Sequence, residues 1–176
     1  MEVIQKYPAR HVVLTGGEPM IASGIRELAA SLRQAGYHIT IETAATVLPE
    51  GIACDLASMS PKLQNSVPSE EKAGSAWVKR HEETRWRPDV AHAWIQQTDY
   101  QFKFVLQTAE DGEEMMRYLK AVECEIPAWK VQIMPEGVTP EALQKRSLEL
   151  VEFCKNYGFR FANRLHIQLF GNTMGT

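Results

Sequence analysis

The sequence predicts an α/β fold, an incomplete (β/α) barrel of the TIM type whose strands are mostly parallel and whose first βα unit is missing. Short β-branched runs alternate with amphipathic helical segments, which is typical of βαβ units. The chain also begins with the expected end of a helix at residues 1–7, which leads directly into a strand. Its 176 residues, 44% of them hydrophobic, predict a single domain over 1–176.

The first predicted strand covers residues 11–15 (HVVLT) and ends at two glycines. A helix follows it, because apolar residues recur there at the spacing of one helix face and Gly36 supplies a stop. The residues of that face are Ile25, Leu28, Ala29 and Leu32. We expect this face to pack on the sheet.

Four further strands are predicted, at residues 38–43, 54–59, 102–106 and 130–134. A helix is expected over 113–122, and a last long helix is capped by Thr139, opened by Pro140 and closed by Gly158. The expected buried residues of this last helix are Leu143, Ser147, Leu150, Val151 and Cys154. Residues 65–100 interrupt the alternation and are interpreted as an insertion that contains one helix and three tryptophans, Trp77, Trp86 and Trp94.

Composition excludes several classes of partner. The formal net charge is -3 and the pI is near 6.0, so we expect no nucleic-acid or membrane partner and a cytoplasmic location. The cysteines, Cys54, Cys124 and Cys154, are odd in number and far apart in sequence. This spacing indicates buried or incidental thiols, with neither a disulfide framework nor a metal site.

The sharpest motif is the pentapeptide TGGEP at residues 15–19, directly after the first strand. Parallel sheets place their ligands at such carboxyl ends of strands. Gly16 and Gly17 let a ligand touch the backbone, and Glu18 can accept hydrogen bonds from an ammonium group. The motif thus suits an amino-acid-like ligand, although a tight turn with a solvated glutamate explains the pentapeptide equally well.

Two more polar motifs follow strands. Glu42 lies at the end of the second strand, and the tripeptide SPK at residues 60–62 follows the third. Because the carboxyl ends of parallel strands share one rim, we expect Glu18, Glu42 and Lys62 to converge there. Taken alone, SPK is better explained as an ordinary exit from a strand into a loop.

The ordered set resembles the radical S-adenosylmethionine enzymes: TGGEP after one strand, IET after the next, SPK after the third and Gln132 in a later strand. The ending RLHIQLFGN at 164–172 resembles the 7-carboxy-7-deazaguanine synthase family in particular. The resemblance implies that S-adenosylmethionine is bound by Gly17, Glu18, Glu42, Ser60, Pro61, Lys62 and Gln132. It further implies that the pterin substrate is bound by Thr15, His166 and the C-terminal residue Thr176.

The reaction implied by this resemblance converts 6-carboxy-5,6,7,8-tetrahydropterin to 7-carboxy-7-deazaguanine and ammonia through a 5′-deoxyadenosyl radical. Members of the family use a [4Fe-4S] cluster, held by a CxxxCxxC loop, and Mg²⁺. Neither set of ligands is present in this sequence, so no catalytic or metal residue is assigned and the chain is expected to be inactive alone. An external electron donor such as flavodoxin is also implied, and a homodimer is possible.

Two alternatives stay open at this point. One is a cluster-free protein or fragment that binds S-adenosylmethionine without catalysis. The other is a different radical enzyme, such as a glycyl-radical activase, against which the tail containing His166 argues.

Overall fold

A computed structural model describes residues 4–67, 74, 79 and 84–173. They form a six-stranded sheet in which the strands stand in chain order, β1 to β6. Every neighbouring pair is parallel. The strands are β1 (His11–Leu14), β2 (His38–Thr43), β3 (Leu56–Met59), β4 (Asp99–Leu106), β5 (Val131–Pro135) and β6 (Arg160–Phe161).

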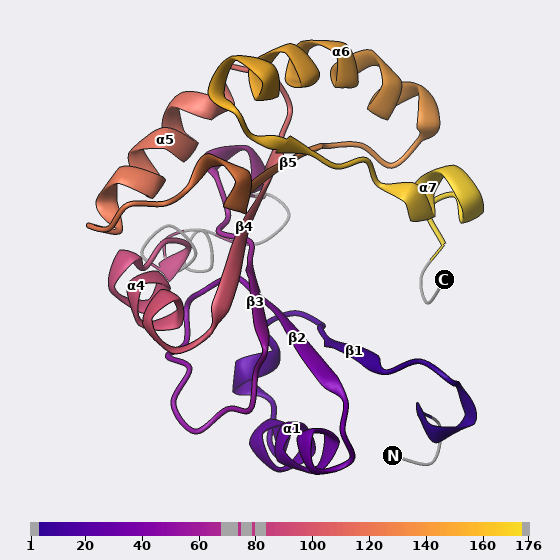
Figure 1. Cartoon of the computed structure of the whole chain (residues 1–176). Helices are drawn as coiled ribbons and strands as arrows, with labels where there is room; N and C mark the ends of the chain where they lie inside the picture. The colour runs from indigo at the N-terminus through magenta and orange to yellow at the C-terminus, as the bar shows by residue number, and fades with distance from the viewer. Residues whose placement is uncertain (1–3, 68–73, 75–78, 80–83, 174–176) are drawn as a thin grey trace.

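The helices cover the outer, convex side of this sheet (Figure 1). They are α1 (Ile25–Gln34), α4 (Pro88–Gln97), α5 (Asp111–Ala121) and α6 (Pro140–Tyr157). The short helix α7 (Leu165–Phe170) follows β6 and does not belong to this layer. Single 3-10 turns lie at Ile4–Lys6, Pro19–Ile21, Gln64–Ser66 and Ala128–Lys130. Since right-handed crossovers between strands in sequential order all pass over the same face, the opposite face stays free of helices.

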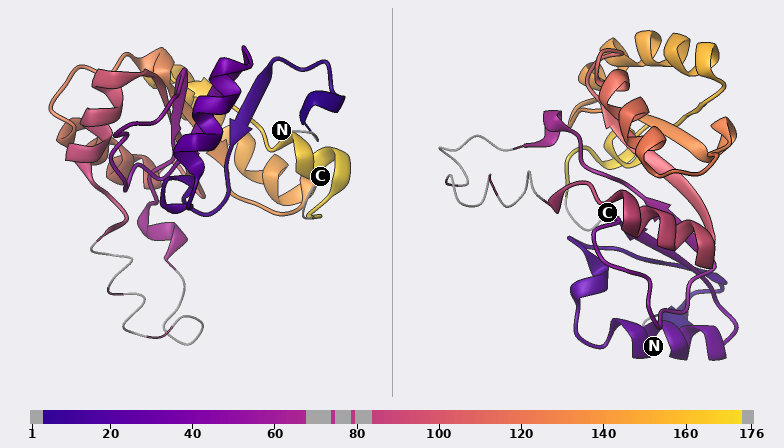
Figure 2. Two further views of the ribbon diagram at one scale, coloured as in Figure 1. Left: turned by 90° about the horizontal axis from the view of Figure 1, so that it is seen from below. Right: turned by 90° about the vertical axis from the view of Figure 1, so that its left-hand side faces the viewer.

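The sheet curves into an open arc, with β1 and α7 on either side of its opening (Figure 1), and α1 and α6 lie at opposite ends of the molecule (Figure 2). The predicted α/β class, the parallel strands and the partial barrel are therefore confirmed, and the barrel is not closed. Within the described part of the chain, no helix combines the length and the apolar character that crossing a membrane requires.

Some predicted boundaries were wrong by a few residues. The third strand begins at Leu56 rather than at residue 54, because the Asp55 carboxylate takes the backbone N–H of Ile39 (2.8 Å) and pairs with Arg33 (2.7 Å). The fourth strand begins earlier than predicted, at Asp99, which is the register partner of Leu56. Helix α5 begins and ends slightly earlier than predicted, and β5 is shifted by one residue.

Three segments departed further from expectation. The two-residue strand β6 and helix α7 were not predicted, since both are too short to show a periodic pattern. The expected helix end at 1–7 is a 3-10 turn over Ile4–Lys6, with residues 1–3 outside the described part. In the stretch 65–100 the expected helix is present: it is α4, the crossover helix between β3 and β4, while Trp77 lies outside the described residues.

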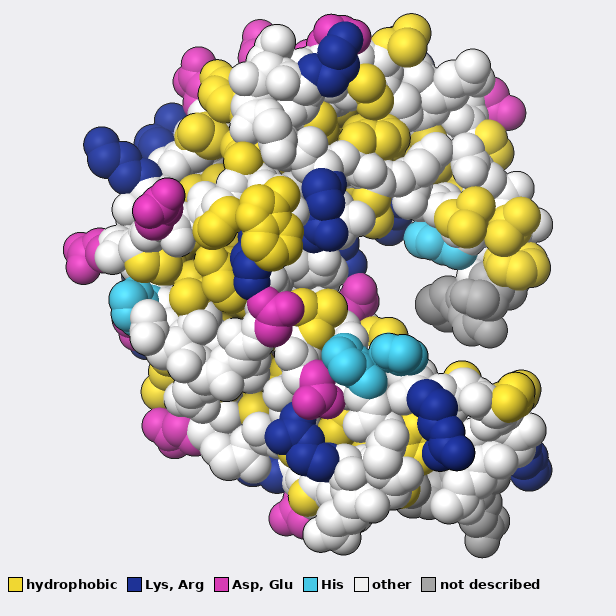
Figure 3. Space-filling view, in the orientation of Figure 1, with side chains coloured by type: hydrophobic (Ala, Val, Ile, Leu, Met, Phe, Trp, Pro, Cys, Tyr) yellow, Lys and Arg dark blue, Asp and Glu magenta, His cyan; other side chains and the backbone are white. Residues whose placement is uncertain are grey.

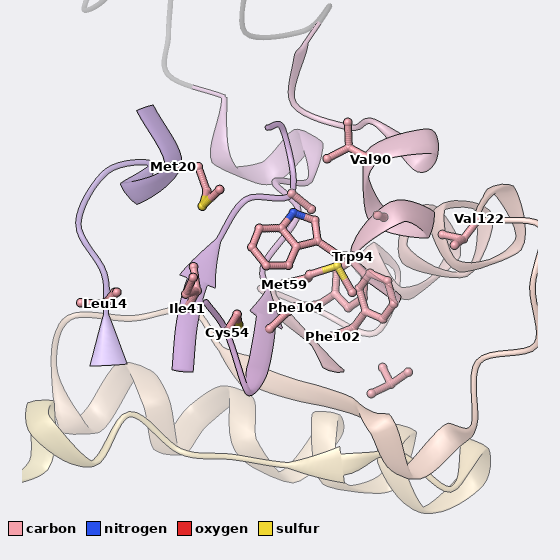
Figure 4. Close-up of a cluster of buried hydrophobic side chains, with 14 of the residues drawn as sticks. Leu14, Met20, Ile41, Cys54, Met59, Val90, Trp94, Phe102, Phe104 and Val122 are labelled. Atoms are coloured by element: carbon pink, nitrogen blue, oxygen red, sulfur yellow. The ribbon is translucent and has the colours of Figure 1, made fainter. Parts of the chain in front are cut away.

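The hydrophobic core lies between the sheet and its helices. Trp94 of α4 is fully buried beside Met59, Phe102 and Phe104 (Figure 4), and its indole N–H donates to the Val47 carbonyl at 3.0 Å. Burying such a side chain removes well over 100 Å² from water, which stabilises the fold by several kcal/mol, roughly. Trp94, one of the three tryptophans of the predicted insertion, is thus a central core residue.

The predicted helix faces are largely confirmed. In α1, Ile25, Ala29 and Leu32 are buried, whereas Leu28 is 36% exposed. Helix α6 is capped as predicted, because the Thr139 hydroxyl accepts the Ala142 N–H at 3.2 Å and Gly158 adopts a φ of 72°. Of its predicted core residues Leu143, Leu150 and Cys154 are buried, and Ser147 and Val151 are only partly buried.

The helix-free inner face of the sheet is polar. Because side chains alternate along a strand, the residues between the core positions point to this face. They include Thr40, Glu42, Ser58, Gln101, Lys103, Gln132 and Arg160. The space-filling view is hollowed on this side (Figure 3). The fold therefore presents polar groups to a concavity.

Candidate functional site on the rim of the sheet

The carboxyl ends of the strands form one rim, as expected for parallel strands in sequential order. A recess of about 100 Å³, called the first recess below, lies where β1, β2 and β3 end. Its lining unites the three predicted motifs: Thr15, Gly16, Gly17, Glu42, Thr43, Ala44, Ser60, Lys62 and Lys103. The predicted convergence of Glu42 and Lys62 with the glycine loop is thus present in the structure.

The glycine loop leaves backbone accessible to a ligand. Gly16 has a φ of 144°, a conformation that favours glycine because it lacks a Cβ. A Cβ placed on Gly17 would meet nothing within 4 Å. The open space in front of this loop therefore allows another molecule to approach the main chain closely.

Glu18 binds the loop after β2. Its carboxylate accepts the Thr43 hydroxyl (2.9 and 2.8 Å to its two oxygens) and the Ala44 N–H (2.9 Å). It also accepts the Met20 N–H (3.2 Å) and the Thr46 hydroxyl (3.4 Å). In this arrangement the carboxylate fixes two rim loops against each other, a role that sequence reasoning did not assign to it.

Glu42 points into the first recess from β2. It accepts the Lys103 ammonium at 2.9 Å and the Thr15 hydroxyl at 3.1 Å. Burial alone would raise the pKa of Glu42, but the hydrogen bond and charge of Lys103 outweigh it, and the pKa is lowered. Glu42 is therefore ionised at neutral pH.

Lys103 was missed by sequence reasoning. The signal was present, because Asp99, Gln101 and Lys103 alternate with the aromatic core residues of β4. This alternation places Lys103 on the inner face, beside its register partner Gln132 of β5. Gln132 is thus on the expected face, and among the described residues its amide has no hydrogen-bond partner.

Lys62 is also unpaired within the described part of the chain, where no carboxylate and no hydrogen-bond acceptor reaches its ammonium. Its side chain is accessible to solvent, yet it stands in a recess that displaces much of the surrounding water. This desolvation, together with repulsion from Lys103, lowers the pKa of Lys62. Ser60 stands beside it in the recess lining, and Pro61 between them is buried.

A second recess, of about 310 Å³, continues along the rim past the ends of β4, β5 and β6. It shares Ser60 and Lys62 with the first recess and is bounded on its far side by Arg164. Sequence reasoning used Arg164 only as part of the tail motif. Nothing in the strand pattern predicted its position, because β6 consists of two residues.

The predicted residues of the tail are placed apart from these recesses. His166 is exposed on α7 and belongs to the lining of neither recess. Thr176 lies outside the described residues. Of the two predicted substrate contacts that the structure describes, Thr15 and His166, Thr15 lines the first recess, where its hydroxyl donates to Glu42.

The cysteines do not form a metal-binding group. Cys54 lies between β2 and β3, Cys154 is in α6 and Cys124 follows α5, and all three are free. Burial raises the pKa of Cys54 and of Cys154 to about 11, so both are protonated thiols at neutral pH. Across the described residues, no three His, Cys, Asp or Glu side chains gather in a way that could hold a metal ion.

Fold and site together define a class: an α/β protein with an open, sequentially ordered parallel sheet and two adjoining recesses on its carboxyl rim. No protein-family model matches the chain. Known proteins nevertheless resemble it in sequence and in fold.

Three relatives are named 7-carboxy-7-deazaguanine synthase. The protein from Rhodopirellula baltica is 40% identical over 177 residues, covering 100% of this chain and 67% of the relative. Those from Halobacterium salinarum and Pyrobaculum aerophilum are each 35% identical, covering 98% and 94% of this chain and 70% and 67% of the relatives. The chain belongs to the 7-carboxy-7-deazaguanine synthase family.

The fold likeness extends to a solved structure. QueE from Escherichia coli matches with a TM-score of 0.61 at 22% identity, covering 92% of this chain and 59% of that chain. The chain thus spans about two thirds of the length of its named relatives and somewhat less of QueE. Because the chain belongs to this family, the alternative of a glycyl-radical activase, left open by the sequence, is excluded.

Proposed function

We propose that this chain binds S-adenosylmethionine and 6-carboxy-5,6,7,8-tetrahydropterin side by side on the rim of its sheet. In the proposed reaction the pterin becomes 7-carboxy-7-deazaguanine and ammonia. Family membership supports the proposal. The observation that carries it is the convergence of the glycine loop, Glu42 and Lys62 in one recess.

The residues of the first recess fit S-adenosylmethionine. The methionyl end needs reachable backbone and a cation for its carboxylate, which Gly16, Gly17 and the unpaired Lys62 provide. Glu42 in the recess offers an acceptor for the ribose, and Gln132, which lies outside the recess lining as the register partner of Lys103, offers an amide for the adenine. When bound and given one electron by an external donor, the cofactor would break a carbon–sulfur bond to give methionine and a carbon radical, which can take a hydrogen atom from the substrate.

The residues described here do not fit a [4Fe-4S] cluster. Such a cluster needs cysteine thiolates close together, whereas Cys54, Cys124 and Cys154 lie on separate elements. No step is therefore assigned to a cluster held by these residues. A cluster-free protein that binds S-adenosylmethionine alone is the second candidate function. The electron donor and the homodimer stay predictions.

Anaerobic calorimetric titration of the whole chain separates these functions. We expect heats of binding for S-adenosylmethionine and, in a second titration, for the carboxytetrahydropterin. Gly17→Val should weaken cofactor binding roughly tenfold or more, because its side chain would fill the space in front of the loop. The matched control is Ala30→Val on the exposed side of α1, which should change nothing.

Each outcome has a definite reading. Binding of both ligands, with Gly17→Val impaired, supports the synthase-type site. Binding of S-adenosylmethionine without the pterin supports the cluster-free alternative. Binding of neither ligand overturns the proposed function.

A further inference from the structure

The second recess has the dimensions and lining of a separate ligand compartment. Its volume of about 310 Å³ reaches the range of small-molecule pockets, while the first recess is much smaller. Pro61 and Val105 supply apolar walls, and Gln107 offers an amide that is unpaired among the described residues. A flat, polar-edged ring system suits such a lining.

Arg164 is the unusual residue of this compartment. One terminal nitrogen, Nη1, donates to the Gly137 carbonyl at 2.9 Å, which anchors the guanidinium. Its Nε is buried without a hydrogen-bond partner. No carboxylate in the described chain forms an ion pair with Arg164. A buried, unpaired donor on a charged group is unfavourable by itself, so this arrangement indicates that a ligand supplies the acceptor.

The charges around Arg164 point the same way. Lys62, at the border between the two recesses, forms no ion pair within the described chain. Repulsion by Arg164 contributes to the lowered pKa of that lysine, although Glu42 and Glu18 attract its ammonium at longer range. The nearest acid of the lining, Glu136, is taken by Arg146 at 3.1 Å. The compartment therefore carries two cations, Lys62 and Arg164, that form no ion pair within the described chain, although the net charge of the whole chain is -3.

We propose that Arg164 binds the carboxylate of the pterin substrate in the second recess and thereby positions the ring against Pro61 and Val105. The inference rests on the proposed function, which places the methionyl end of the cofactor on the other side of Lys62. A guanidinium can hold a carboxylate through two parallel hydrogen bonds. Arg164 would thus be a residue that sets substrate specificity.

The test compares two pterins on variants of the whole chain. Wild type is titrated with 6-carboxytetrahydropterin and with tetrahydropterin that lacks the carboxylate, and we expect the second to bind about 10- to 100-fold more weakly. Arg164→Gln should lose a similar factor toward the carboxylated pterin and little toward the other. Arg164→Lys should fall between, because it keeps the charge without the paired geometry. Arg117→Gln, on the exposed side of α5, is the matched control.

Titration with S-adenosylmethionine shows whether Arg164 binds the carboxylate of the pterin or the methionyl carboxylate of the cofactor. We expect Arg164→Gln to keep cofactor affinity within about twofold of wild type. A parallel loss of cofactor affinity would assign Arg164 to the methionyl carboxylate and overturn the inference. Equal affinity of wild type for both pterins would overturn the inference as well. This comparison needs no variant, so it does not depend on whether a variant folds. If wild type binds no pterin at all, the proposed function has failed first.

Discussion

The two halves of the rim differ in how fully their charged side chains are paired. At the ends of β1 and β2, Glu18 accepts donors from four residues and Glu42 is held by Lys103 and Thr15. Toward the ends of β3 and β6, Lys62 and Arg164 have no carboxylate partner within the described chain. The same rim thus contains satisfied acids and unsatisfied bases.

This difference separates scaffold from ligand contacts. A charged group that makes all its hydrogen bonds within the protein stabilises the fold. Its removal leaves the partner groups without a hydrogen-bond partner. A charged group without partners contributes little to stability and is available to a ligand of opposite charge. The comparison predicts opposite results for substitutions in the two halves, ranked here by their effect on the free energy of unfolding.

Glu18→Ala should have the largest effect, lowering the free energy of unfolding by about 3 kcal/mol. The reason is that the Thr43 hydroxyl and the Ala44 N–H lose their acceptor in a partly buried position. Urea denaturation followed by circular dichroism measures the change. The matched control, Glu125→Ala, removes an exposed acid without a partner in the described chain and should stay close to wild type. Wild-type stability for Glu18→Ala would contradict the scaffold role.

Lys103→Met should lower the free energy of unfolding at pH 7 by about 1 kcal/mol, a value reduced by solvent screening. The pKa of Glu42 is lowered in the folded chain, so the unfolded chain binds more protons. The contribution of the pair is therefore present above the ordinary pKa of 4.5 and is lost as pH falls through the lower folded value. The variant should show a weaker loss of stability over this range.

Urea denaturation at a series of pH values between neutral and strongly acid conditions checks this expectation. Lys120→Met, on the exposed side of α5, serves as control and should keep the wild-type pH dependence. If Lys103→Met instead shows the wild-type dependence of the free energy of unfolding on pH, the ion pair between Glu42 and Lys103 does not stabilise the fold. Glu42 would then be grouped with Lys62 and Arg164 as a charged group available to a ligand.

The convergence of the motifs could be predicted from sequence because it depends only on strand order. Once β1, β2 and β3 are parallel neighbours, their carboxyl ends must meet, and with them Thr15, Glu42 and Ser60. The buried faces of α1 and α6 were likewise set by helical periodicity. These features arise from local patterns that repeat along the chain.

The pairing of each charge could not be predicted in this way. Whether Glu18 faces a ligand or the loop after β2 depends on the path of that loop, for which the sequence has no periodic signal. Arg164 is placed by a strand of two residues, and Trp94 belongs to a stretch whose composition indicated an insertion. In all three cases tertiary contacts outweigh the local pattern.

Lys62→Met should have the smallest effect on stability and so tests the comparison from its other side. Removing this ammonium relieves its repulsion by Lys103 and Arg164 but also removes its attraction to Glu42 and Glu18. Because these effects oppose each other, the free energy of unfolding should change by less than about 0.5 kcal/mol. Because the pKa of Lys62 is lowered in the folded chain, raising the pH should bring wild type closer to the variant.

Affinity for S-adenosylmethionine should respond in the opposite sense, falling about tenfold in Lys62→Met because a charged hydrogen bond to the ligand is lost. Lys120→Met should leave both stability and affinity unchanged. A loss of stability as large as that of Glu18→Ala, without a change in affinity, would assign Lys62 to the scaffold. In that case the absence of an ion-pair partner would not indicate where a ligand binds. The distinction between the two halves of the rim would then not separate scaffold residues from ligand contacts.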